Sequence, residues 1–171
     1  MLEENRQQLS KLMSLYRSDE EGVKAKREAE KQAQMKFVAD FERLKHEVIW
    51  PAFVDFGNEL TNYGHNFHVA EEKEYVDAIA SFHPAHITLS LYPSSLSSEY
   101  CKPESAPYVS FMANGYAKKI GIVVSTMTPE NGGSIGSHGE YEPGKITRDF
   151  VEKELIDVLK NSLIFHTEKA N

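Results

Sequence analysis

The spacing of hydrophobic residues changes at Gly64, and this change divides the chain into a helical part and a part made of strands. Residues 1 to about 62 contain two glycines, one proline and many strong helix formers. After Gly64, by contrast, His65, Phe67 and Val69 occupy every second position, as in a half-buried strand. We therefore predict an α+β fold: a small antiparallel sheet of about four strands packed by a C-terminal helix, preceded by a long, kinked N-terminal helical arm.

The arm is predicted to cover residues 1–47 and the compact α+β domain residues 48–171. The sequence Ser18-Asp19-Glu20-Glu21 has the pattern of a capping box, and Gly22 follows it, so we expect a break or kink near residue 18. A short amphipathic helix should precede the break, with Leu9, Leu12, Met13 and Tyr16 on one face. A longer helix should follow it, with a narrow stripe at steps of mostly four residues, formed by Ala25, Ala29, Ala33, Phe37, Phe41, Leu44 and Val48.

An alanine stripe buries little area, and at ~25 cal/mol per Å² it cannot hold a long helix in place without help. Some partner must therefore cover the arm. We expect this partner to be a second copy of the chain in an antiparallel pair, because two-fold homodimers are the commonest assemblies. The alternatives are that the arm folds back on its own sheet, or that another protein covers it.

The remaining elements are predicted from local signals. Pro51 should kink an apolar helix that begins at Val48 and stops near Gly64, with Trp50, Phe53 and Phe56 in the core. Residues 71–82 are ambiguous and favour a short helix, whereas 86–92 alternate as a strand. Residues 94–98 and the prolines after them predict an exposed loop, and glycine-rich residues 128–145 a long mobile loop. Thr147 should cap the C-terminal helix, whose buried stripe is Val151, Leu155, Val158, Leu159 and Ser162.

The dipeptide Asn114-Gly115, between two apolar runs, predicts a hairpin with a two-residue type I′ turn. This turn pairs Ala113 with Tyr116, Phe111 with Lys118 and Val109 with Ile120. One face of the hairpin is then fully apolar (Val109, Phe111, Ile120, Ile122 and Val124) and the other semi-apolar (Tyr108, Met112, Val123 and Met127). The first face requires a helix layer and the second some other cover.

Four of the seven histidines form the pairs His65-x2-His68 and His83-x2-His86, which suggests a metal site. Residues three apart on a strand point to opposite faces, so neither pair can chelate one ion. One histidine from each pair would have to meet across neighbouring strands, and we name His68 and His86 as the candidate metal ligands. The alternative is that the histidines are ordinary polar surface residues.

Two other segments contain residue types that can carry chemistry. The glycine-rich loop 132–139 could surround an anion with backbone amides, but neither a Walker loop nor a dinucleotide fingerprint is present. The single cysteine, Cys101, cannot form an intramolecular disulfide, and no nucleophile elbow or paired-carboxylate motif stands out. The sequence contains no arrangement that demands an enzyme, and we expect no cofactor.

With 19 Lys and Arg against 26 Asp and Glu, the formal charge of −7 argues against nucleic acids and anionic membranes as partners. The lone cysteine and the polar N-terminus indicate a cytoplasmic protein. We expect a non-enzymatic interaction protein (adaptor, chaperone-like protein or scaffold subunit) that self-associates through the arm or the semi-apolar sheet face. The alternative is a small-molecule or metal-binding domain that uses His65, His68, His83 and His86 or the loop 132–139.

Overall fold

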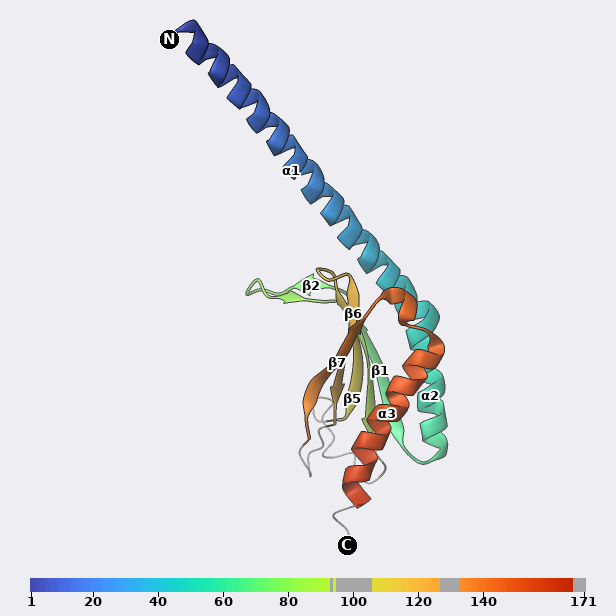
Figure 1. Cartoon of the computed structure of the whole chain (residues 1–171). Coiled ribbons are helices and arrows are strands. Elements are labelled where there is room, and N and C mark those ends of the chain that lie inside the picture. The colour runs from blue at the N-terminus through green and yellow to red at the C-terminus, as the bar shows by residue number, and fades with distance from the viewer. Residues whose placement is uncertain (93, 95–105, 127–132, 168–171) are drawn as a thin grey trace. The chain divides into compact units, whose positions relative to one another are not determined.

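The structure is a computed structural model that describes residues 1–92, 94, 106–126 and 133–167, with side chains up to residue 160. The chain divides into two compact units, Met1–Lys36 and Phe37–Asn171. Its elements, labelled in part in Figure 1, are α1 (Glu3–Leu44), a π-helical segment η1 (Lys45–Ile49), α2 (Trp50–Asn62), β1 (Asn66–Glu72), β2 (Tyr75–Val76), β3 (Phe82–His83), β4 (His86–Tyr92), β5 (Tyr108–Asn114), β6 (Lys119–Ser125), β7 (Ile135–Tyr141), a 3₁₀ turn η3 (Pro143–Lys145) and α3 (Arg148–Thr167).

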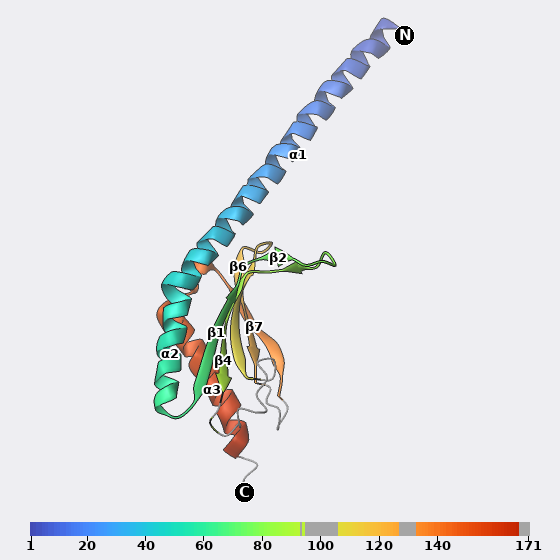
Figure 2. The same ribbon diagram turned by 180° about the vertical axis from the view of Figure 1, so that it is seen from behind.

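The second unit is built on a five-stranded antiparallel sheet in the order β1-β4-β5-β6-β7. Helices α2 and α3 lie side by side on one face of this sheet, as the two opposite views in Figure 1 and Figure 2 show. The short strands β2 and β3 pair separately and form a hairpin that extends away from the main sheet. The α+β fold with an antiparallel sheet, a C-terminal helix and a long N-terminal helix is therefore confirmed.

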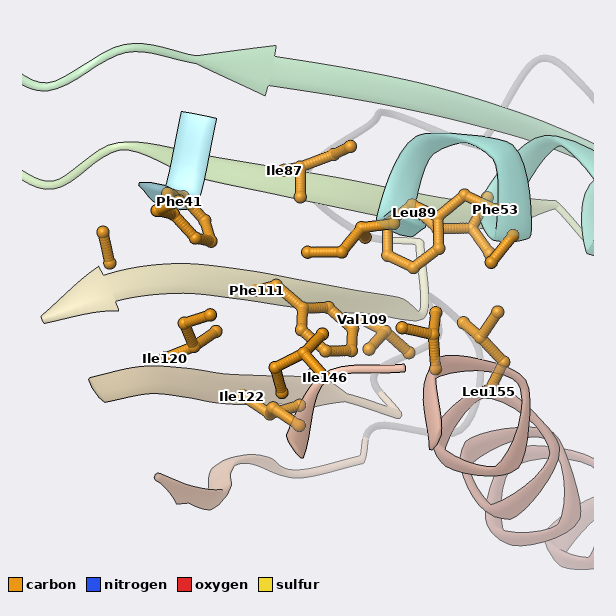
Figure 3. Packing of buried hydrophobic residues seen from close by; sticks show 14 of the residues in the cluster. Phe41, Phe53, Ile87, Leu89, Val109, Phe111, Ile120, Ile122, Ile146 and Leu155 are labelled. Atoms are coloured by element: carbon orange, nitrogen blue, oxygen red, sulfur yellow. The ribbon is translucent and has the colours of Figure 1, made fainter. Parts of the chain in front are cut away.

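The core lies between the helices and the sheet (Figure 3). The face predicted to be fully apolar supplies it, since Val109, Phe111, Ile120 and Ile122 are all completely buried. The ring of Phe53 in α2 meets the ring of Phe111 edge-on, with centroids 5.8 Å apart. The other buried members are Phe37, Phe41, Ile49, Ala52, Ala85, Ile87, Leu89, Leu91, Ala113, Ile146, Val151, Leu155 and Val158. Phe37 and Phe41 thus belong to the core although they precede residue 48.

The break predicted near Ser18 is wrong, because α1 is a continuous α-helix from Glu3 to Leu44. A capping box needs its serine outside the helix, and a single exposed glycine such as Gly22 costs only about 1 kcal/mol relative to alanine. Strong helix formers on both sides outweigh that cost. The irregularity lies instead at η1, directly before Pro51, where the amide of Trp50 donates to the carbonyl of Lys45. Since a proline ring crowds the carbonyl four residues before it, the wider π turn provides room.

Gly64 ends α2 as predicted. Its φ is +84°, and its amide donates to the carbonyl of Thr61, while the amide of His65 donates to that of Leu60. This pair of hydrogen bonds is a Schellman motif, which requires a left-handed residue after the helix and therefore favours glycine. Phe53 is buried and Phe56 is partly buried, but Trp50 is 37 % exposed, so its prediction as a core residue is wrong.

The hairpin at Asn114 exists, but its predicted turn and register are wrong. Asn114 pairs with Lys119 and Phe111 with Ile122, so the strands are shifted by four residues and the loop is Gly115–Lys118. The left-handed residue is Lys118, with φ 54°, and the side chain of Asn114 accepts a hydrogen bond from the amide of Ala117. Because four is an even number, the shift leaves every side chain on the predicted face of the sheet.

Two segments between the main strands also differ from the prediction. Residues 71–82 contain no helix: they hold the end of β1, strand β2 and the start of β3. Residues 135–141, predicted as part of a long loop, form the edge strand β7. Its sequence has little strand propensity, and pairing with β6 overrides that local preference. The predicted loop 94–98, Cys101 and Met127 lie outside the described residues, apart from Ser94.

The C-terminal helix begins as predicted. The hydroxyl of Thr147 accepts a hydrogen bond from the amide of Phe150 at 3.2 Å, which is the geometry of an N-cap. Ile146 and Val151 are both buried at the start of this helix. The predicted stripe packs on the sheet, with Val151, Leu155 and Val158 buried and Leu159 partly buried, while the side chain of Ser162 lies outside the described residues.

Candidate interaction surface

The N-terminal unit, residues 1–36, exposes many large apolar side chains. All residues from 1 to 32 are exposed. Four of the apolar ones recur at steps of three, four and seven residues and therefore share one face: Leu9, Leu12, Tyr16 and Val23, hereafter the N-terminal stripe. They are between 46 and 63 % exposed, and Met13 and Leu15 beside them are equally accessible. Exposed apolar side chains that share one helix face form a candidate binding surface.

A shallow hollow lies beside the N-terminal stripe at Gly22, which has no side chain and no neighbouring atom within 4 Å of where one would start. Leu12, Tyr16 and Val23 line this hollow together with Leu15, Ser18, Asp19 and Lys26. A glycine between large side chains allows another backbone to approach closely. The hollow therefore leaves room for a second element to approach the helix at this point.

Charged side chains beside the hollow are sorted by sign. Asp19, Glu20 and Glu21 form an acidic block before Gly22, and Lys24, Lys26 and Arg27 form a basic block after Val23. Each block carries three formal charges and all six residues are exposed. The helix therefore presents opposite potentials within two turns of each other.

The hairpin of β2 and β3 is a second exposed apolar surface, which sequence reasoning missed because 71–82 was read as a helix. Tyr75, Val76, Ile79 and Phe82 are exposed, Ile79 to 84 %. The carboxylate of Asp77 organises the turn by accepting hydrogen bonds from the amides of Ile79 and Ser81 and lies 2.9 Å from His83 Nε2.

Along the described chain, no helix combines the length and the apolar character needed to cross a membrane.

The face of the main sheet opposite the helices is only partly apolar, as predicted. Tyr108, Met112 and Val123 are half-buried on it. Its centre is polar, since the hydroxyl of Thr88 donates to the buried hydroxyl of Ser110 at 2.8 Å. Satisfied hydroxyls at the centre weaken the case for a purely hydrophobic interface on this face.

A completely buried lysine lies where the π segment meets the end of β1, and no sequence pattern indicated it. Lys45 Nζ lies 3.0 Å from Glu42 Oε1, 3.5 Å from Glu71 Oε2 and 3.4 Å from the carbonyl oxygen of Glu72. An ammonium group has three N–H donors, and three acceptors surround this one. The ion cluster therefore ties η1 to the sheet, because a charge this deeply buried is tolerated only when it is paired.

The structure does not bring the four candidate histidines together. His68 and His86 lie on the sheet face opposite the helices, but His68 is paired with Ser90 and His86 with Glu72, four residues along the strand. That offset corresponds to about 13 Å. His65 accepts a hydrogen bond from the amide of Ser94, and His83 stacks on Tyr75.

Within the described ranges, no group of three or more His, Cys, Asp or Glu side chains is arranged to hold a metal ion. Metal binding by His68 and His86 stays a prediction.

The described part of the glycine-rich segment 132–139 is used mainly for strand pairing. From Ile135 onward its backbone pairs with β6 rather than curving around an anion. A bulge opposite Ile122 and Val123 leaves His138 without a partner in the register, and its Nδ1 lies 2.6 Å from Glu154 Oε2 in α3. The bulge therefore connects the edge strand to the C-terminal helix.

No protein-family model, curated protein or solved structure matches this chain.

Proposed function

We propose that the protein is a non-enzymatic interaction protein, a scaffold or adaptor subunit, that self-associates through its N-terminal unit. The observation that carries this proposal is the exposure of the N-terminal stripe along a helix in which residues 1–32 have no buried side chain. Isolated helices are marginal in water, and most of their stability in proteins comes from packing an apolar face. A second copy supplies such a face.

The sheet face opposite the helices is the other surface for self-association. Its apolar side chains are already half-buried and its central hydroxyls are paired with each other, so less apolar area is gained by covering it. The side chains of the N-terminal stripe are more exposed than those of the sheet face. This comparison favours the helix as the interface.

The experiment uses the full-length chain. Wild-type protein should sediment at twice the chain mass of 19.4 kDa. The double variant Leu9→Glu/Tyr16→Glu places two carboxylates in the N-terminal stripe and should weaken the dimer by on the order of a hundredfold or more, because four buried side chains per dimer become charged.

The matched control is Gln7→Glu/Ser14→Glu, which adds the same two charges to the same turns on the opposite face of the helix. It should remain dimeric. A monomeric wild type would overturn the proposal. A Leu9→Glu/Tyr16→Glu variant that stays as dimeric as the control would overturn the role of the helix and leave the sheet face as the interface.

The metal-binding alternative is tested by the same native mass measurement. A stoichiometric ion on protein purified without added metal, lost in His68→Ala/His86→Ala, would support that function instead.

A further inference from the structure

We propose that the two N-terminal units pair antiparallel, with the two-fold axis at Gly22 and Val23. This inference rests on the proposed function, because it assigns the orientation and register of the same interface. It is carried by the order of charges and side-chain sizes along residues 9–33, which differ on the two sides of Gly22.

The charge order distinguishes the two orientations. In a parallel, in-register pair the acidic block Asp19–Glu21 would lie beside its own copy, and the basic block would do the same. In an antiparallel pair centred between the blocks, Asp19 and Glu20 of each chain lie beside Lys26 and Arg27 of the other, whereas Glu21 and Lys24 lie on the far side of the helix. Like charges side by side repel and opposite charges attract, so the antiparallel pair is favoured twice over.

The side-chain sizes point to the same register. In a pair centred between Gly22 and Val23, each residue before the axis lies opposite the residue of the other chain that is equally far beyond it. Leu12 then lies near Ala33 of the other chain, and Tyr16 lies near Ala29. Large side chains opposite small ones fill an interface without overlap.

Gly22 itself lies at the axis. With no side chain and open space around its Cα, it allows the two helices their closest approach there. The hollow lined by Leu12, Leu15, Tyr16 and Val23 surrounds this point, so it is filled from the other chain. The second chain thus occupies the hollow of the first. Both chains contribute the same residues to the contact, as an isologous interface requires.

Cysteine cross-linking tests the orientation. In full-length protein with Cys101→Ser, a cysteine at Gly22 should cross-link to its own copy with a short bismaleimide, because it lies at the axis. Leu12→Cys should not cross-link to itself but should cross-link to Ala33→Cys in an equimolar mixture. Self-linked Leu12→Cys with no mixed product would overturn the antiparallel register, while its dimer would still support self-association. A chain that is monomeric overturns both proposals.

Charge exchange gives a second, independent test. Replacing Asp19, Glu20 and Glu21 with lysine should raise the dimer dissociation constant by roughly tenfold or more, because basic blocks then face each other. Replacing Lys24, Lys26 and Arg27 with glutamate should do the same. Combining both sets exchanges the blocks and should restore wild-type affinity. A combined variant as weak as either single set would overturn the pairing of acidic with basic blocks.

Discussion

The ammonium of Lys45 lies 3.0 Å from a carboxylate oxygen of Glu42, and the lysine side chain is only 1 % exposed. The two residues are three positions apart, at the end of α1 and the start of η1. Glu71 from β1 adds a second carboxylate at 3.5 Å. Glu42 and Glu71 both keep access to water, so the lysine carries most of the desolvation cost.

This arrangement predicts different outcomes for two substitutions of Lys45. Lys45→Met keeps the volume of the aliphatic chain and leaves two partly exposed carboxylates that water can solvate. We expect its free energy of unfolding to change by less than about 1 kcal/mol. Lys45→Ala also leaves a cavity and should lower the free energy of unfolding by about 2–3 kcal/mol. Chemical denaturation measures both, and equal losses in the two variants would contradict this account of the cluster.

A second prediction concerns Gly57 in α2, which the ring of Phe67 in β1 covers. A Cβ at position 57 would overlap that ring. Gly57→Ala should therefore lower the free energy of unfolding by about 1–2 kcal/mol, although alanine is the better helix former. Adding Phe67→Leu should recover part of the loss, because the smaller side chain makes room. Thermal unfolding of the two variants checks this, and an alanine variant that is more stable than wild type would disprove the close approach.

A third prediction follows from the β2–β3 hairpin. The hydrogen bond from His83, followed by those from the amides of Ser81 and Ile79, holds the pKa of the Asp77 carboxyl below its usual 3.8. A lowered pKa means that the ionised carboxylate is favoured in the folded hairpin. The contribution of this carboxylate to the stability of the folded state is complete above the pKa of the unfolded chain. It is lost as the pH falls through the lower pKa of the folded chain.

The amide resonances of Ile79 and Ser81 should therefore be unchanged by the Asp77 titration above about pH 5 and shift together with a midpoint below 3.8. NMR titration of the intact chain measures this midpoint. Asp77→Ala, which has no carboxylate, should lack the step at all pH values. A midpoint at or above 3.8 in the wild type would refute the assignment.

A fourth prediction tests the cap of α3. Thr147→Ala removes the acceptor of the Phe150 amide and should lower the free energy of unfolding by about 1 kcal/mol. Thr147→Ser keeps the hydroxyl and should lose only a few tenths of that amount. If the alanine and serine variants unfold at the same denaturant concentration, the hydroxyl does not stabilise the helix.

Elements whose signal is local were predicted well. Thr147 and Gly64 are recognisable because a helix cap involves only the backbone within a few residues of it. The alternation of Ile87, Leu89 and Leu91 likewise reports which side of a strand is buried. The candidate interface was visible in part, since Leu9, Leu12 and Tyr16 were assigned to one helical face.

Features that depend on distant residues were predicted poorly. Strand β7 exists because β6 offers it an edge, and its own sequence, rich in glycine and serine, resembles a loop. The burial of Lys45 requires Glu71 from β1, twenty-six positions further along the chain. The β2–β3 hairpin was missed because Tyr75, Ile79 and Phe82 also fit a helical period.

The amino-acid sequence by itself therefore determined which faces of the helices and strands are apolar, and where α2 ends and α3 begins. Tertiary structure decided the register of β5 against β6, the pairing of β7, and the enclosure of Lys45 between η1 and β1. The reason is physical: periodicity and caps are satisfied by atoms within one or two turns, whereas a register or a buried charge is stabilised only when segments far apart in the chain meet. The order of charges around Gly22 can be recognised in the local sequence. It can stabilise a contact, however, only when a second helix lies beside it.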